Sequence, residues 1–88
     1  MKQFPIYFSS GYVDGDDDND IFIESVFKLS EDFQLTEITK TTSIPHDVST
    51  PETIQWEFKV SKFDKNIDKI INEISETEFL EFKNEFDS

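Results

Sequence analysis

The sequence contains no cysteine, alanine or arginine, and only two glycines and three prolines among its 88 residues. Without cysteine the chain can form neither a disulfide nor a zinc site built on thiolates. Because small residues are scarce, the core must consist of a few bulky side chains, and 15% of the residues are aromatic. A chain of this size predicts one domain, residues 1–88, in which roughly 60–65% of the surface can be buried.

Long apolar runs are also absent. No stretch approaches the length of a transmembrane helix. The N-terminal segment Met1–Val13 lacks the apolar core and the small-residue cleavage site of a signal peptide. These two absences predict a cytoplasmic protein.

Positive charge is scarce as well, since eight Lys face 20 Asp and Glu and the net charge is −12. A charge of this size favours solubility and costs some stability through self-repulsion. It argues against binding to nucleic acid or to an anionic membrane, because both require Lys/Arg patches. It permits a basic protein partner, such as a nucleic-acid-binding protein or a nuclease. The aromatic and β-branched content argues against disorder.

The segment Thr53–Ile74 changes its hydrophobic period partway along. From Ile54 to Val60 apolar and polar residues alternate, which is the period of a half-buried strand. From Asp64 the spacing lengthens to that of an amphipathic helix, whose apolar stripe would be Ile67, Ile70, Ile71 and Ile74. Three further strands are predicted upstream of this segment, at Phe4–Val13, Ile21–Ser30 and Phe33–Thr42.

The C-terminal segment carries the signature of a second helix. Ser75 precedes Glu78 by three residues, as in a capping box, and Ile74 and Phe79 occupy the two positions of a hydrophobic staple. This pattern predicts a helix that begins at Ser75 and ends near Phe86. The alternative is one continuous, kinked helix that includes the preceding segment.

We therefore predict an α+β fold, an antiparallel meander of three to four strands with C-terminal helical structure packed on one face. The predicted core comprises Ile6, Phe8, Ile21, Ile23, Phe27, Leu29, Ile54, Trp56, Phe58, Val60, Ile67, Ile70, Ile71 and Ile74.

The loop between the first two predicted strands has the alternate acidic spacing of a calcium-binding loop. The match then fails, because the sixth position is Asn19 rather than Gly and the twelfth is Ser25 rather than a bidentate Glu. This loop is interpreted as a solvated hairpin turn, with a partner-binding patch and a weak calcium site as alternatives.

Three glutamates of the C-terminal segment recur at i, i+3 and i+7, so on a helix they form one stripe with rises of roughly 4.5 and 6 Å. A row of carboxylates on a rigid helix can imitate the phosphates of a nucleic acid, and an ordinary solvated helix face is the alternative. The candidate partner-binding residues from both acidic segments are Asp14, Asp16, Asp17, Asp18, Asp20, Glu24, Glu78, Glu81 and Glu85.

The single histidine, His46, lies beside Asp47 in a proline-containing loop. A His–Asp pair can act as a general base, but no nucleophile or glycine-rich oxyanion loop accompanies this one. We therefore interpret His46 as a loop residue and assign no catalytic residue, cofactor or metal ligand.

The leading functional hypothesis is a non-enzymatic acidic inhibitor that occupies the basic nucleic-acid site of another protein. In size and charge alone, the chain is similar to phage anti-defence inhibitors that imitate nucleic acid, and to immunity proteins or antitoxins. An immunity protein or antitoxin for one toxin is the alternative, and a weak calcium-binding module is the third hypothesis.

Overall fold

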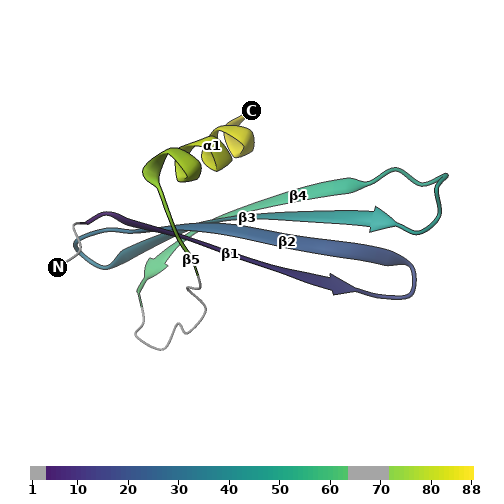
Figure 1. The fold of residues 1–88 in the computed structure, drawn as a ribbon, viewed down its shortest axis with the longest axis horizontal. Helices are drawn as coiled ribbons and strands as arrows, with labels where there is room; N and C mark the ends of the chain where they lie inside the picture. The colour runs from purple at the N-terminus through teal and green to yellow at the C-terminus, as the bar shows by residue number, and fades with distance from the viewer. Residues whose placement is uncertain (1–3, 64–71) are drawn as a thin grey trace.

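The structure is a computed structural model that describes residues 4–63 and 72–88. The described residues form a five-stranded sheet and one C-terminal helix, so the α+β class is confirmed and the predicted number of strands is too low. In chain order (Figure 1) the elements are β1 (Ile6–Gly15), β2 (Asn19–Leu29), β3 (Gln34–Pro45), β4 (Thr53–Lys62), β5 (Asn72–Ile74) and α1 (Glu76–Asp87).

The five strands pair antiparallel in the order β4-β3-β2-β1-β5. Strands β1 to β4 follow one another as a meander, and β5 then pairs with only three residues of β1, Tyr7–Ser9. Within the described residues, the remainder of β1 and the outer side of β4 are therefore edges of the sheet. Pro5 immediately precedes β1, as expected for a residue that has no N–H to donate.

One apolar cluster joins α1 to the sheet. The strand register brings Tyr7, Val26 and Ile38 to neighbouring positions on one face. Phe79 of α1 is buried against these three side chains, and Ile38 is completely buried. The ring centroids of Tyr7 and Phe79 lie 5.1 Å apart. The helix is therefore fixed to the sheet by a side chain near its first turn.

The aromatic stripe of α1 continues from this cluster to β4. The Trp56 ring meets Phe82 edge-on at 5.4 Å and Phe86 at 5.7 Å. Phe58 stacks on Phe86 with 5.9 Å between the ring centroids. These aromatic pairs hold the C-terminal half of α1 over the edge strand.

A second apolar cluster lies on the opposite face, near the beginning of β1. Phe27, Leu29 and Leu35 are buried there, and Phe8 and Phe63 pack against them. Phe8 lies opposite Phe27, and Leu29 lies opposite Leu35. The sheet therefore carries apolar side chains on both faces. This follows from the sequences of β2 and β3, which have apolar residues at both odd-numbered and even-numbered positions.

The N-terminus of α1 is capped by Ser75, as the capping-box spacing predicts, but the reciprocal bond from the Ser75 backbone N–H to the Glu78 carboxylate is not among the contacts of the described residues. The Ser75 hydroxyl accepts a hydrogen bond from the Glu78 backbone N–H at 3.1 Å, and it also lies 3.4 Å from the Glu78 carboxylate. Ile74 packs against the cluster that contains Phe79, as a hydrophobic staple requires. The predicted second helix is therefore confirmed.

Two predictions about residues 64–74 have different outcomes. The alternative of one continuous helix is wrong, because Asn72–Ile74 form a strand that pairs with β1. β-branched Ile74 suits this position, since its side chain packs beside the strand residue Tyr7. The remainder of the predicted helix from Asp64, with its stripe of Ile67, Ile70 and Ile71, lies outside the described residues.

The predicted core is only partly correct. Ile6, Phe27 and Leu29 are buried, whereas the β4 residues Ile54, Phe58 and Val60 are 47%, 49% and 47% exposed. The cause is the position of β4 at the sheet edge, where only part of its apolar row is covered by α1. The predicted core residues that are half-buried are Phe8, Ile21, Ile23, Trp56 and Ile74. The buried residues that the prediction omitted are Tyr7, Val26, Leu35, Ile38 and Phe79.

Ile38→Ala should lower the free energy of unfolding by about 2–5 kcal/mol, because it leaves a cavity beneath Phe79. The milder Ile38→Val should cost about 0.5–1.5 kcal/mol and keep the domain folded. Urea denaturation measures both values. Val48→Ala is the control, since Val48 is fully exposed. Equal effects of Ile38→Val and Val48→Ala would contradict the central position of Ile38.

Candidate functional site

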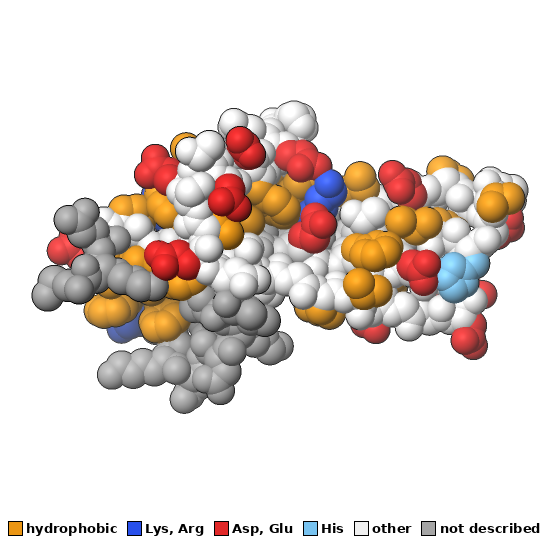
Figure 2. Space-filling view, in the orientation of Figure 1, with side chains coloured by type: hydrophobic (Ala, Val, Ile, Leu, Met, Phe, Trp, Pro, Cys, Tyr) orange, Lys and Arg blue, Asp and Glu red, His pale blue; other side chains and the backbone are white. Residues whose placement is uncertain are grey.

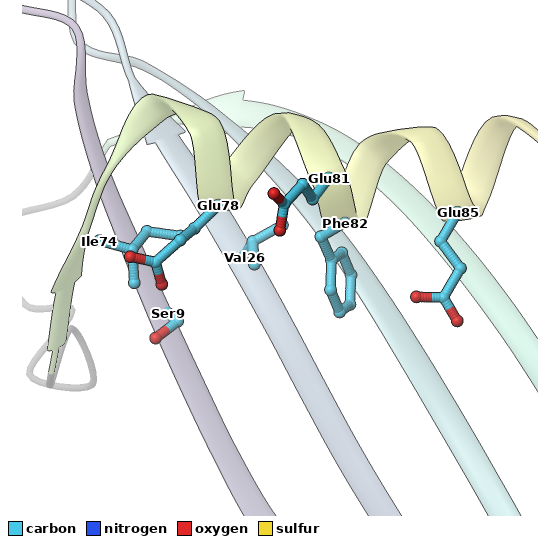
Figure 3. A pocket seen from close by; sticks show the side chains of 7 residues that line it. All are labelled: Ser9, Val26, Ile74, Glu78, Glu81, Phe82 and Glu85. Atoms are coloured by element: carbon cyan, nitrogen blue, oxygen red, sulfur yellow. The ribbon is translucent and has the colours of Figure 1, made fainter.

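The cap and the aromatic stripe together set the direction of the predicted glutamate row. Phe79 and Phe82 face the sheet, so Glu78 and Glu81, each one residue earlier, lie beside that contact on one side of α1. The row borders a groove of about 340 Å³ between the helix and the sheet. Figure 3 shows the residues that line it, Ser9, Val26, Ile74, Glu78, Glu81, Phe82 and Glu85.

The groove, hereafter the acidic groove, combines an apolar floor with an acidic rim. Val26, Ile74 and Phe82 supply the floor, and the three glutamates of α1 supply the rim. All three glutamates are exposed, and Ser9 of β1 adds a hydroxyl group on the opposite wall. The groove can therefore accept a long side chain with an apolar stem and a cationic end.

Lys40 supplies a positive charge at the Glu85 end of the acidic groove. Lys40 Nζ forms an ion pair with Glu85, and it lies 5.5 Å from the centroid of the Trp56 ring. The hydrogen bond to Glu85 raises the pKa of Lys40, and the nearby charge of Glu24 raises it further. Glu24 is the direct cross-strand neighbour of Lys40. Sequence reasoning missed this lysine, because 45 residues separate it from Glu85.

Glu81 has no hydrogen-bond or ion-pair partner among residues 4–63 and 72–88, and Glu78 bonds only within its own cap. Within the described residues, the end of the acidic groove at Glu78 and Glu81 therefore carries negative charge without a paired cation.

Tyr7 lies beneath the start of the helix. Its hydroxyl donates a hydrogen bond to Glu76 at 3.3 Å. Burial raises the pKa of Tyr7, and the Glu76 carboxylate raises it further. Tyr7 is therefore a core residue, whereas Tyr12 on the same strand is 59% exposed.

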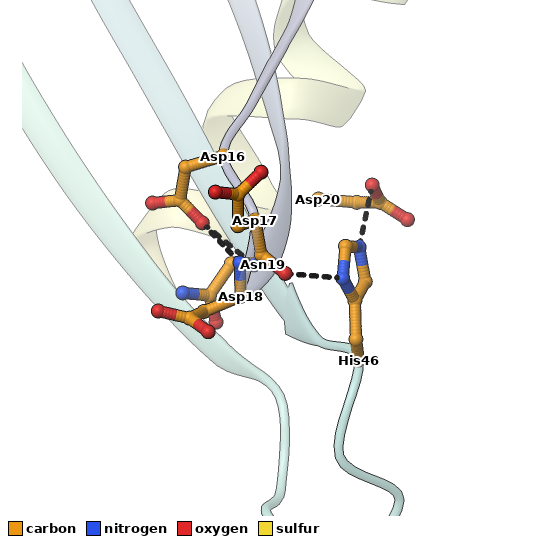
Figure 4. Close-up of polar contacts among 6 residues, drawn as sticks. All are labelled: Asp16, Asp17, Asp18, Asn19, Asp20 and His46. Atoms are coloured by element: carbon orange, nitrogen blue, oxygen red, sulfur yellow. Dashed lines mark hydrogen bonds and ion pairs between the residues drawn. The ribbon is translucent and has the colours of Figure 1, made fainter.

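The acidic loop is a tight turn at the far end of the β1–β2 hairpin (Figure 4). The Asp16 carboxylate accepts hydrogen bonds from the backbone N–H groups of Asp18 at 2.8 Å and Asn19 at 2.7 Å. These two bonds lower the pKa of Asp16. Asp16 therefore stabilises the turn, as aspartates commonly do.

His46 connects this turn to the loop after β3. Its ring nitrogens lie 3.1 Å from the Asp17 carbonyl oxygen and 3.1 Å from an Asp20 carboxylate oxygen, and its backbone N–H donates to the Asp18 carbonyl at 2.9 Å. Both ring contacts are acceptors, so only the doubly protonated imidazolium donates to both. The Asp20 hydrogen bond, followed by the Asp17 carbonyl, raises the pKa of His46. The interpretation of His46 as a plain loop residue missed this contact.

The two acidic segments occupy different parts of the molecule. Figure 2 shows carboxylates over α1 and, separately, around the histidine at the other end of the sheet. By register, Glu24 and Asp20 lie on the face that contacts α1, between the acidic groove and the turn, whereas Asp14 lies on the opposite face. The predicted set is thus divided into the helix row Glu78, Glu81 and Glu85, the strand residues Glu24 and Asp20, Asp14 alone, and the turn Asp16, Asp17 and Asp18.

No group of three or more His, Cys, Asp or Glu side chains in residues 4–63 and 72–88 is arranged to hold a metal ion. No helix in the same residues is long and apolar enough to cross a membrane. The chain matches no protein-family model, and it shows no significant similarity to a curated protein or to a solved structure.

In a pH titration followed by NMR, His46 should show a pKa above its ordinary value of 6.5. A raised folded-state pKa means that the stabilisation is complete below the unfolded value and is lost as the pH rises through the folded value. Asp20→Asn should lower the His46 pKa toward the value measured for the urea-unfolded chain. A wild-type pKa at or below that reference would contradict the contacts described for His46.

Calcium should bind the turn weakly, with a dissociation constant above about 10 µM, outside the range of sensor loops. The Asp16 carboxylate already bonds the turn, and Ser25, at the twelfth ligand position, is buried with its hydroxyl 2.9 Å from Thr39. Isothermal titration measures the constant, with Asp16→Asn as the control. Tighter binding that this variant abolishes would favour the calcium hypothesis instead.

Proposed function

We propose that this protein is a non-enzymatic, cytoplasmic inhibitor that binds a basic partner protein and occupies its nucleic-acid-binding site. The observation that carries the proposal is the row of Glu78, Glu81 and Glu85 along the acidic groove. In this proposal α1 lies on one face of the sheet and presents the row to the partner. The partner would be a nucleic-acid-binding protein or a nuclease.

The chemistry of the acidic groove supports a basic partner. A lysine or arginine side chain can lay its methylene stem on Val26 and Phe82 while its charged end reaches a glutamate. Arginine can in addition form paired hydrogen bonds with one carboxylate, which adds both energy and geometric specificity to the ion pair. Since Glu78 and Glu81 lack a cation among the described residues, such a partner would not displace an existing ion pair at that end.

The distribution of charge along the molecule supports a partner site that normally holds a polyanion. Beyond Glu85 the same face continues with Glu24 and Asp20, which are separated by roughly 13 Å along β2. The described part of the molecule is elongated, with extents of 50 × 29 × 19 Å. Carboxylates spaced along an elongated body suit a basic channel better than a compact pocket.

The first test is capture of the partner and competition with nucleic acid. Immobilised protein should retain a basic protein from a lysate of its native host, and duplex DNA or RNA should release it. A retained protein that nucleic acid does not release would contradict occupation of a nucleic-acid site. If that protein is a toxin that does not bind nucleic acid, the immunity hypothesis replaces this one.

The second test compares two variants of equal charge. Glu78→Gln/Glu81→Gln/Glu85→Gln removes the row, and Glu31→Gln/Asp47→Asn/Glu52→Gln removes three charges from loops. Both variants carry three fewer negative charges than the wild type, whose net charge is −12. The helix variant should slow association with the captured partner at low salt much more than the loop variant, because the row is the proposed contact.

Association rates are measured at low and high salt, and melting temperature serves as the control for folding. The difference between the two variants should shrink at high salt, because screening weakens the steering of exposed charges. Equal association rates for the two variants at low salt would show that the acidity acts only through net charge, and the proposed site would then be wrong.

A further inference from the structure

Among residues 4–63 and 72–88, no strand pairs with the outer side of β4, which therefore presents a row of unpaired backbone groups at the edge of the sheet. The Phe63 backbone N–H donates to the Phe33 carbonyl of the neighbouring chain segment at 2.8 Å. Hydrogen-bonded and non-hydrogen-bonded pairs alternate along an antiparallel ladder. The odd-numbered residues of β4 therefore bond to β3, and the even-numbered ones direct their N–H and C=O groups outward. These are Ile54, Trp56, Phe58, Val60 and Lys62.

A hydrogen bond between β3 and β2 independently shows which residues of β3 bond to β4. The Ser30 N–H donates to the Gln34 carbonyl at 3.0 Å, so the even-numbered residues of β3 bond to β2 and its odd-numbered residues bond to β4. Glu37 and Lys59 are accordingly a bonded pair of the β3–β4 ladder, which agrees with the assignment from Phe63.

The same even-numbered residues carry the apolar side of β4. Ile54, Phe58 and Val60 are each about half exposed, although they are large and apolar. Exposed edge strands with this character are templates for pairing with another chain, and proteins usually shield them. Within the described residues α1 covers only part of this row, through the contacts of Phe82 and Phe86 with Trp56 and Phe58.

The charges on β4 select the partner that fits this edge. Glu57 and Lys59 flank Phe58 symmetrically and lie on the face opposite α1. If a second β4 pairs antiparallel with Phe58 opposite Phe58, each Glu57 lies opposite a Lys59 of the other copy. In the same register Trp56 faces Val60 of the other copy, so the apolar rows also adjoin.

The charges on β4 favour this register over its alternatives. A two-fold antiparallel pair can be centred on a hydrogen-bonded or on a non-hydrogen-bonded residue pair, so any residue of β4 can be its centre. Centring on Glu57 or on Lys59 would place two like charges directly opposite each other. Centring on Trp56 would place Gln55 opposite Glu57, and centring on Val60 would place Glu57 opposite Phe63. Only the centre at Phe58 pairs both charges with opposite charges and includes the whole strand.

The free part of β1 is less suited to a second copy. It carries Asp14 and leads directly into the acidic turn Asp16–Asp18, with no lysine among residues 10–18. Two copies paired there would bring like charges together, which is unfavourable for directly opposed strand residues.

We propose that two copies of this chain associate through antiparallel pairing of their β4 strands, centred on Phe58, into one continuous sheet. The two-fold axis is then perpendicular to the sheet, so both α1 helices and both acidic grooves lie on the same side. This inference concerns the β4 edge and does not depend on the function proposed for the acidic groove.

Sedimentation velocity of the full chain over increasing concentration tests the proposal. A species of twice the monomer mass should appear and should become more abundant when sodium chloride is added, because screening reduces repulsion between two chains of net charge −12. A protein that stays monomeric at high concentration and high salt, or one that forms open-ended larger species, would overturn the proposal.

A charge exchange tests the register. Glu57→Lys places lysines opposite each other in the dimer, and Lys59→Glu places glutamates opposite each other, so each variant alone should be monomeric. An equimolar mixture should form a heterodimer, because every opposed pair then combines opposite charges. Glu57→Lys also controls for net charge. It makes the chain less acidic, so an effect of net charge alone would strengthen association rather than abolish it.

Folding of each variant is checked by its melting curve. In Lys59→Glu the new glutamate lies opposite Glu37 of β3, so some loss of stability is expected. In Glu57→Lys the new lysine lies opposite Thr39, so no like-charge pair forms within the sheet. Val60→Pro supplies an independent variant, because its backbone N–H points outward and its loss removes no bond to β3. A folded Val60→Pro or Glu57→Lys chain that dimerises like the wild type would overturn the proposal.

Discussion

Phe79 joins the helix to the sheet, and the positions of the three glutamates of the acidic groove follow from that contact. Its ring packs on Tyr7 at 5.1 Å and is buried with Val26 and Ile38. Because a helix repeats every 3.6 residues, fixing Phe79 also fixes the direction of the glutamates beside it. The cap at Ser75 sets where the helix begins, so a short capping motif and one buried ring together orient the acidic row.

Lys40 and His46 each pair with an acidic residue that is distant in the sequence. Lys40 pairs with Glu85 where α1 passes over the central strands. His46 contacts Asp20 and the Asp17 carbonyl where the hairpin turn meets the next loop. Lys40 thus lies between Glu85 of α1 and Glu24 of β2, and His46 lies beside Asp20 and Asp16 of the acidic segment. Glu81 has no such cation within the described residues, and it belongs to the row that we propose as the partner contact.

Features of the fold that depend on local chemistry could be predicted from the sequence. The meander follows from alternating residues and turn composition, and the start of α1 follows from the spacing of Ser75 and Glu78. The strand β5 could not be predicted, because its isoleucine continued a helical spacing and its pairing with Tyr7–Ser9 is a long-range contact. Local patterns carry no information about which distant strand will be adjacent.

In the core and in the site as well, local features could be predicted from the sequence and long-range contacts could not. Alternation identified the apolar row of β4, but it could not show that β4 is an edge strand and that Phe58 is therefore half exposed. Likewise the spacing of Glu78, Glu81 and Glu85 could be read directly, whereas Val26 of the groove floor and Lys40 come from strands far away in sequence. The local sequence determines which residues share one face of a helix. Tertiary structure determines which distant residues pack against that face.

The pairing of β5 with β1 also bears on the order in which the molecule folds. The hairpins from β1 to β4 join neighbouring segments, whereas the contact of Tyr7 with Ile74 closes a loop of most of the chain. Closing a long loop costs more entropy than closing a short one, so non-local pairing is intrinsically slower. We therefore expect the meander to form first and β5 with α1 to dock afterwards. The acidic groove would then be the last part of the protein to assemble, and partly folded chains would lack it.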